Sequence, residues 1–209
     1  MSPLDQYKGV THRIAHLNAI YAYVEKQKTS VLRTDELLRA EWVARVSALD
    51  LYVHELVAQK MSEIFLNARI AGTSYANFKI SIEAVSRIKS ASTATDAAAA
   101  FDFEVRRQHS FLTFQDPDKI ADAIRAISTI ELWNEVALKW GASSNTKRDE
   151  AKKIKRQLSQ IVERRNKIAH EGDLQPVIPR IPWPIDSNSV SEVANFLDRL
   201  VATIDDLVI

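Results

Sequence analysis

The sequence predicts an all-α protein: a helical bundle with a long second helix and a proline-rich connection before the last helix. Apolar residues recur at steps of three, four or seven along most of the 209 residues, as amphipathic helices require. The alternation typical of strands is confined to one short stretch, residues 78–82. The composition, 46% hydrophobic and 26% charged, is that of an ordinary globular protein. We therefore expect a single helical domain that spans residues 1–209.

The first three helices follow from apolar periodicity. Apolar residues at helical spacing predict a first helix over residues 4–24. Thr34 or Asp35 supplies the capping residue of a long second helix, which keeps the same period as far as Ala71-Gly72. A third helix begins near Ser81, whereas the Ala/Ser/Thr-rich residues 90–100 give no clear boundary between loop and helix.

Clearer start and stop signals mark the second half of the chain. Asp116-Pro117 combines an N-cap with proline at the first helical position, and the helical period continues from there through Leu132 towards a break at residues 141–145. A basic helix then extends from about Thr146 to His170, and Gly172 ends it. The four prolines of residues 173–187 predict an extended connection, after which Ser189 to Glu192 form a capping box for the last helix.

Several classes of protein are excluded or disfavoured by composition. The chain has no cysteine, which excludes disulfides, thiolate zinc sites and cysteine nucleophiles. No apolar run approaches the roughly 18 residues that would span a bilayer. The N-terminus has no basic region followed by an apolar stretch, so it does not read as a signal peptide. We expect a cytoplasmic protein that does not bind membranes.

Charge is strongly segregated near the C-terminus. Residues 147–170 contain nine lysines and arginines against three acids, whereas residues 171–209 contain two arginines against seven acids. Such segregation indicates a localised positive face for a polyanion, although a solvated helix face would give the same pattern. The basic residues that we expect to contact RNA are Lys152, Lys153, Lys155, Arg156, Arg164 and Lys167.

The chemistry concentrates in Arg165, Asn166 and His170. An arginine offers fixed charge and a planar set of donors to a phosphate, and a histidine exchanges protons near neutral pH. Arg165 also interrupts the apolar stripe of its helix, a position at which a guanidinium must be paired, lie at an interface or face a cleft. On an ideal helix Arg165 and His170 are about 140° apart. Either the helix end distorts, or a second copy of the helix supplies the partner group.

The run from Arg164 to Asp173, with its arginine, adjacent polar residue and histidine after four intervening residues, resembles the HEPN superfamily of helical ribonucleases, and more narrowly the RiboL-PSP-HEPN group. Residues 50–56 and 110–115 resemble that group more loosely, which suggests that Asp50, His54 and Glu55 support the site. The resemblance implies a symmetric homodimer with a composite site that cleaves RNA without a metal or cofactor, and frequent roles in toxin–antitoxin or antiviral systems. An antitoxin or another protein partner is then expected.

Two alternatives remain open at this stage. In the first, His170 binds a backbone carbonyl at the helix end and Arg165 pairs with Glu55 or Asp50, so the motif is structural. In the second, the protein is a non-catalytic module of the same fold that binds RNA, a nucleotide or a partner protein. The acidic C-terminal part either shields the site or binds a basic surface on a partner.

Overall fold

The computed structural model describes residues 1–27 and 33–208, and these form eight α-helices and one short 3₁₀ helix. The elements are α1 (Pro3–Lys26), α2 (Asp35–Phe65), η1 (Tyr75–Asn77), α3 (Ile82–Ser90), α4 (Ala94–His109), α5 (Pro117–Ile127), α6 (Leu132–Lys139), α7 (Lys147–Glu171) and α8 (Ser187–Val208). The predicted all-α fold, with its long second helix, is confirmed.

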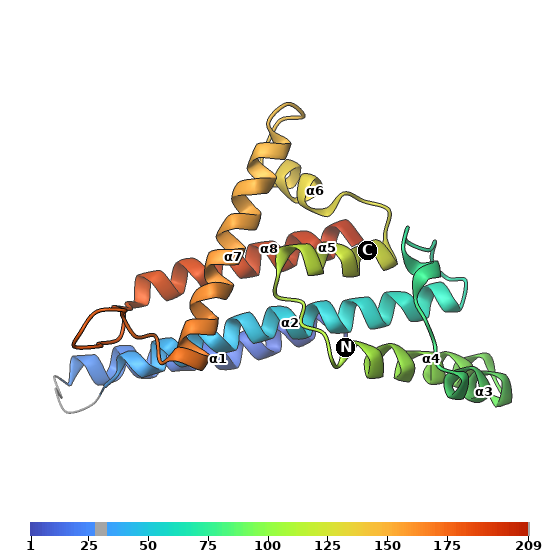
Figure 1. Cartoon of the computed structure of the whole chain (residues 1–209), viewed down its shortest axis with the longest axis horizontal. Helices are drawn as coiled ribbons and strands as arrows, with labels where there is room; N and C mark the ends of the chain where they lie inside the picture. The colour runs from blue at the N-terminus through green and yellow to red at the C-terminus, as the bar shows by residue number, and fades with distance from the viewer. Residues whose placement is uncertain (28–32, 209) are drawn as a thin grey trace.

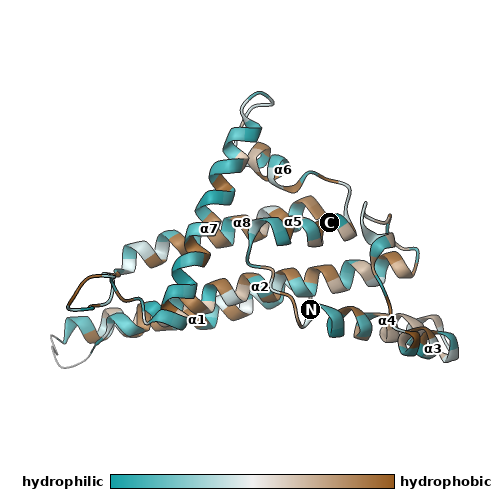
Figure 2. Cartoon of the chain, viewed as in Figure 1, coloured by the Kyte–Doolittle hydropathy of each residue, from teal (hydrophilic) through white to brown (hydrophobic). Residues whose placement is uncertain are grey.

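The long helices α1 and α2 form an antiparallel pair along the long axis of the molecule, and α8 packs against α2 (Figure 1). Helices α3 and α4 lie together towards the far end of α2 (Figure 1). The basic helix α7 crosses α2 at a steep angle and projects from the bundle with α6 packed along it (Figure 1). Its face seen in Figure 2 is predominantly hydrophilic.

One hydrophobic core connects these helices. α2 is its centre, because its apolar side chains from Leu38 to Met61 are buried against α1, α4, α5, α7 and α8. α7 contributes Ile154, Leu158 and Ile161, the apolar stripe predicted from the sequence. The core therefore fixes α7 from Ala151 to Ile161, and none of the later residues of the helix is fully buried.

Local capping chemistry explains where several helices begin. Ser2 and Asp5 form a reciprocal capping box at the start of α1. Asp116 caps α5 by accepting the amides of Asp118 and Lys119, with Pro117 in the first turn, as predicted. Each cap satisfies amide groups that would otherwise lack partners in the first helical turn.

Some boundaries differ from the predictions. The helix that begins at Asp116 ends at Ile127 rather than continuing to residue 141, because Ser128 is extended (φ −155°, ψ 162°) and a separate helix starts at Leu132. Residues 90–100, in which no helix boundary was predicted, contain the start of α4, and Thr93 caps that helix. α2 ends at Phe65, six residues before the expected limit.

The caps of two other helices differ from the predictions in part. Thr34 is the N-cap residue of α2, as predicted, but its hydroxyl donates to Glu25 and makes no capping hydrogen bond to the helix. α8 starts at Ser187, before the expected capping box, and the carboxylate of Asp186 accepts the Ser189 amide at 2.8 Å. In the described part of the chain, the one β-bridge joins Leu174 and Pro182, within the proline-rich connection. None of the described helices combines the length and apolar character needed to cross a membrane.

Gly72 marks a close approach between the segment after α2 and the end of α5. Its amide donates to Ala126 O at 3.2 Å, and the Ser74 amide donates to Arg125 O at 3.0 Å. A Cβ at residue 72 would lie 2.3 Å from Arg125 O, a distance that no ordinary contact allows. The pairing of these two backbones therefore requires glycine.

We predict that Gly72→Ala lowers the free energy of unfolding by about 1–3 kcal/mol, because the two backbone segments must separate. Urea unfolding followed by circular dichroism measures the change. The matched control is Gly9→Ala on α1, where the new Cβ meets no atom closer than 3.8 Å, the flexible Arg13 side chain. There alanine raises stability by up to about 1 kcal/mol because of its higher helix propensity. Equal effects at both positions would contradict this explanation.

Candidate functional site

The Arg165–His170 motif occupies the last turns of α7. The helix ends at Gly172, whose φ of 66° is the left-handed conformation that glycine adopts without strain. The amides of Gly172 and Asp173 both donate to Lys167 O and so close the helix. His170 is exposed in the final turn of the helix.

Arg165 and Asn166 are joined directly, whereas His170 stands apart from them. Arg165 Nη1 donates to Asn166 Oδ1 at 3.0 Å. The Arg165 side chain is half-buried, and its Nε is buried with no hydrogen-bond partner among the described residues. Five residues along a regular helix separate Arg165 from His170 by about 7.5 Å and about 140°. The undistorted helix therefore presents the guanidinium and the imidazole on different sides.

The structural alternative for Arg165 is not observed. Asp50 accepts the Phe114 amide, and Glu55 binds both Nη atoms of Arg106, so neither carboxylate pairs with Arg165. No hydrogen bond of the His170 ring to a carbonyl is formed within the described residues. Within the described residues, neither of the two expected structural contacts, Arg165 with an acid or His170 with a carbonyl, is therefore formed.

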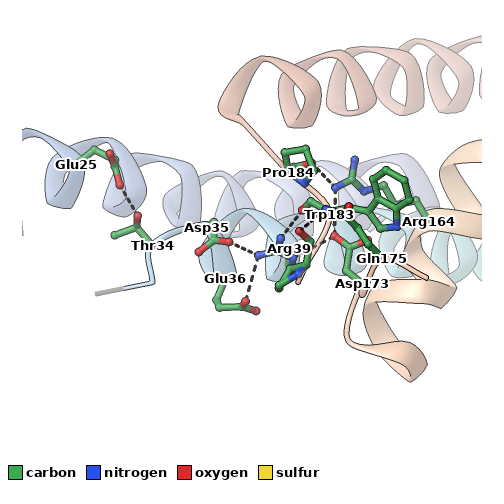
Figure 3. Close-up of polar contacts among 11 residues, drawn as sticks. Glu25, Thr34, Asp35, Glu36, Arg39, Arg164, Asp173, Gln175, Trp183 and Pro184 are labelled. Carbon is green, nitrogen blue, oxygen red and sulfur yellow. Dashed lines mark hydrogen bonds and ion pairs between the residues drawn. The ribbon is translucent and has the colours of Figure 1, made fainter. Parts of the chain in front are cut away.

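Directly after the motif, a buried carboxylate ties the end of α7 to α2. Asp173 is 1% exposed, and its Oδ2 accepts from Arg39 Nε at 3.1 Å and from Arg164 Nη2 at 3.2 Å (Figure 3). The same arginines also hold the proline-rich connection. Arg39 Nη2 donates to Trp183 O at 2.6 Å, and Arg164 Nη2 donates to Pro184 O at 2.8 Å (Figure 3). We call Asp173, Arg39 and Arg164 the carboxylate clamp.

Arg164, which the sequence assigned to RNA binding, belongs to this clamp. Its guanidinium also lies over the Trp42 ring, 5.1 Å from the ring centre, and Trp42 Nε1 donates to Ile161 O on α7. Its charge is therefore already compensated inside the chain. Sequence reasoning missed Arg39 and Asp173, since nothing in the linear pattern pairs residues 134 positions apart.

The other predicted RNA-binding residues lie along the exposed part of α7. Lys152, Lys153 and Lys167 each form an ion pair with an acid one turn away on the same helix. Lys155 pairs with Asp118 of α5, and exposed Arg156 has no ion-pair partner among the described residues. Exposed pairs of this kind contribute little to stability. Each of these lysines can therefore leave its carboxylate partner and bind a phosphate at a small cost in free energy.

The predicted supporting residues Asp50, His54 and Glu55 do not touch the motif. They lie in the middle of α2 and bind the end of α4 and the link to α5. Asp50 accepts the Phe114 amide and a Gln115 side-chain hydrogen bond, and the His54 ring lies 4.5 Å from that of Phe114. Within one chain these contacts hold the α4–α5 link on α2, and a supporting role of the three residues at the Arg165–His170 site stays a prediction.

His109, at the end of α4, is part of this second cluster. Its ring packs edge-on against Phe78 and Phe114, and its Nδ1 is buried without a hydrogen-bond partner in the described chain. Burial, helped by the nearby His54, lowers the pKa of His109 to about 4. The imidazole is therefore neutral at physiological pH.

We predict that His109 makes the protein sensitive to acid. The folded pKa of about 4 lies below the value of 6.5 for an unperturbed histidine, so the unfolded chain binds the proton more readily. This contribution to stability is complete above pH 6.5 and is lost as the pH falls towards 4. His109→Phe keeps a ring in place and should flatten the dependence of the melting temperature on pH between 7 and 4. The exposed His12, changed to Phe, is the matched control; an unchanged slope in His109→Phe would contradict the prediction.

We predict a loss of stability for Asp173→Asn. Asparagine keeps the shape and tolerates the positive φ of 54°, but it leaves two arginines without their shared carboxylate. Arg39 keeps its ion pairs with Asp35 and Glu36, so the loss of the charge-assisted hydrogen bonds to Asp173 costs about 1–3 kcal/mol of unfolding free energy, which denaturant titration measures. Asp149→Asn removes an exposed partner of Lys152 on the same helix and should change stability little. Equal effects of the two variants would show that the clamp is not stabilising.

Comparison with known proteins supports the family suggested by the motif. Among the described residues no three or more His, Cys, Asp or Glu side chains gather in a way that could hold a metal ion. No curated protein and no solved structure matches the chain significantly. A protein-family model described as RiboL-PSP-HEPN matches residues 10–209, nearly the whole chain, including the Arg165–His170 motif. The chain is therefore a member of the RiboL-PSP-HEPN family of the HEPN superfamily.

Proposed function

We propose that this protein is a metal-independent endoribonuclease whose catalytic residues are Arg165, Asn166 and His170. The observation that carries the proposal is the state of the motif at the end of α7. His170 is exposed, Arg165 donates a side-chain hydrogen bond to the neighbouring Asn166, and within residues 1–27 and 33–208 neither is paired with an acid. A histidine and an arginine that do not maintain the fold, in a family of HEPN proteins, are best explained by a ligand with negative charge.

The geometry favours an active site shared between two chains. Within one regular helix, Arg165 and His170 face directions about 140° apart and cannot grip one phosphodiester in a fixed way. Two copies of α7 packed about a twofold axis would bring the arginine of one chain towards the histidine of its partner. The carboxylate clamp holds the end of α7 on α2, so the motif is presented on a well-supported helix end.

The reaction then follows ordinary acid–base chemistry. A neutral His170 removes the proton of a ribose 2′-hydroxyl, or in its protonated form donates a proton to the leaving 5′-oxygen. Arg165 stabilises the negative charge that develops on the phosphoryl oxygens. Asn166, already hydrogen-bonded to Arg165 at 3.0 Å, orients the guanidinium. The products are a 2′,3′-cyclic phosphate and a 5′-hydroxyl, and DNA is not cut because it lacks the 2′-hydroxyl.

The exposed cations of α7 give the RNA a path towards the motif. Lys152, Lys153, Lys155, Arg156 and Lys167 lie on the helix that carries the catalytic residues, and their charges act over about 8–10 Å in physiological salt. Binding through these residues would be independent of sequence and sensitive to salt. Arg164 is left out of this surface, since the clamp engages its guanidinium.

In the cell, we propose that such an activity acts on cytoplasmic RNA as a toxin or antiviral effector, restrained by an antitoxin or another partner protein.

The second candidate function is a non-catalytic module that binds RNA or a protein. The separation of Arg165 and His170 on one helix favours it if the protein is monomeric, because a single chain would then hold RNA without completing the site.

We predict that His170→Ala reduces RNA cleavage at least about 100-fold, the usual contribution of a general acid–base group, while RNA binding changes little. The assay incubates purified protein with 5′-labelled RNA in excess EDTA and identifies cyclic-phosphate ends. His12→Ala changes another exposed histidine and is the matched control.

The result that contradicts the assignment is cleavage at the wild-type rate by folded His170→Ala. Cleavage that stops in EDTA and returns with a divalent cation would contradict the metal-independent mechanism. RNA retention without cleavage by the wild-type dimer would instead support the non-catalytic module.

A further inference from the structure

A second candidate site lies away from α7. A cavity of about 380 Å³ that is open to solvent lies between α2, η1, the end of α4 and α5, and no residue of α7 is among those that line it. Its size is within the range of small-molecule pockets in proteins. Its walls are largely apolar and aromatic, and they include Val57, Met61, Phe78, Leu112, Phe114 and Ala123.

The walls of this cavity are held in place by specific contacts. On one side, Gly72 and Ser74 pair with the carbonyl groups of Ala126 and Arg125, so the segment leading to η1 is fixed to α5. On the other side, the Asp50 carboxylate accepts the Phe114 amide and fixes the link between α4 and α5 to α2. A hollow bounded by segments anchored in this way is present before any ligand binds, which lowers the entropic cost of binding.

Few polar groups reach the cavity, and they define what it can accept. His109 contributes a ring whose Nδ1 has no hydrogen-bond partner among the described residues. Lys119 is exposed at the edge and forms no ion pair in the described chain. The carboxylate of Asp122 also lines the cavity, although Arg125 pairs with it. The cavity thus offers aromatic walls, the edge of a buried imidazole ring and a single positive charge without an ion-pair partner in the described chain.

We propose that this cavity binds a small aromatic carboxylate, with its ring among Phe78, Phe114 and His109 and its carboxylate near Lys119. Aromatic walls favour edge and offset contacts with a flat ring. One lysine matches the single negative charge of a carboxylate, whereas the second charge of a phosphate dianion would have no cationic partner among the lining residues. The proposal does not depend on the ribonuclease activity, since the cavity shares no residue with the Arg165–His170 motif.

The test is a calorimetric titration of the full chain with benzoate and, as its uncharged analogue, benzamide. Benzoate should bind saturably, and benzamide about fivefold more weakly because it lacks the charge that Lys119 attracts. Lys119→Gln should remove this difference between the two probes. Ala123→Leu fills the cavity and should abolish binding of both, with its circular dichroism spectrum showing that it still folds. His170→Ala should bind benzoate as the wild type does.

Three outcomes would overturn the proposal. The first is absence of saturable benzoate binding at about 10 mM, a concentration that detects even millimolar affinity. The second is wild-type binding by both Lys119→Gln and Ala123→Leu, which would place the ligand elsewhere. The third is tighter binding of adenosine or uridine monophosphate than of benzoate, which would contradict the charge argument.

Discussion

The arrangement of the candidate site depends on one buried carboxylate, Asp173. A buried ion is tolerated where charged partners replace water, and here Arg39 of α2 and Arg164 of α7 both bind its Oδ2. The same two guanidinium groups bind Trp183 O and Pro184 O, so one set of contacts orders the end of α7, the proline-rich connection and the start of α2. Without these contacts, the Arg165–His170 motif would lie at a helix end followed by an extended segment, and no buried ion pair would hold that segment on α2.

The helical period imposes the second constraint. The clamp keeps α7 helical through Glu171, and a regular helix separates Arg165 from His170 in direction. A rigid α7 therefore disfavours an active site formed by one chain and favours an active site formed by two chains. The N-terminal end of α7 projects from the bundle beside α6, whereas the end that carries the motif lies beside α1 and α2 (Figure 1), so a second copy would have to pack at that end of the helix.

Much of the fold could be predicted because its signals are local. Asp116-Pro117, Gly172 and the apolar stripe of α7 act through neighbouring residues, and the structure has each of them as expected. The break after Ile127 was missed because Ser128 becomes extended without a glycine or proline to mark it. The clamp was missed because Arg39 and Asp173 meet only in the folded chain. The resemblance pointed to residues 50–56 and 110–115 but could not reveal that Asp50 binds the Phe114 amide, because that contact forms only in the folded chain.

The measurement that tests the account most directly uses a heterodimer of two inactive chains. Chains carrying Arg165→Ala and His170→Ala are produced together with different affinity tags, and dimers that hold both tags are purified. If the site is shared, each active site of the dimer combines the arginine of one chain with the histidine of the other. The heterodimer then keeps both groups in one of its two active sites, so about half of the wild-type cleavage should return. A purified heterodimer as inactive as either parent would contradict the account, because each chain would then need both groups itself.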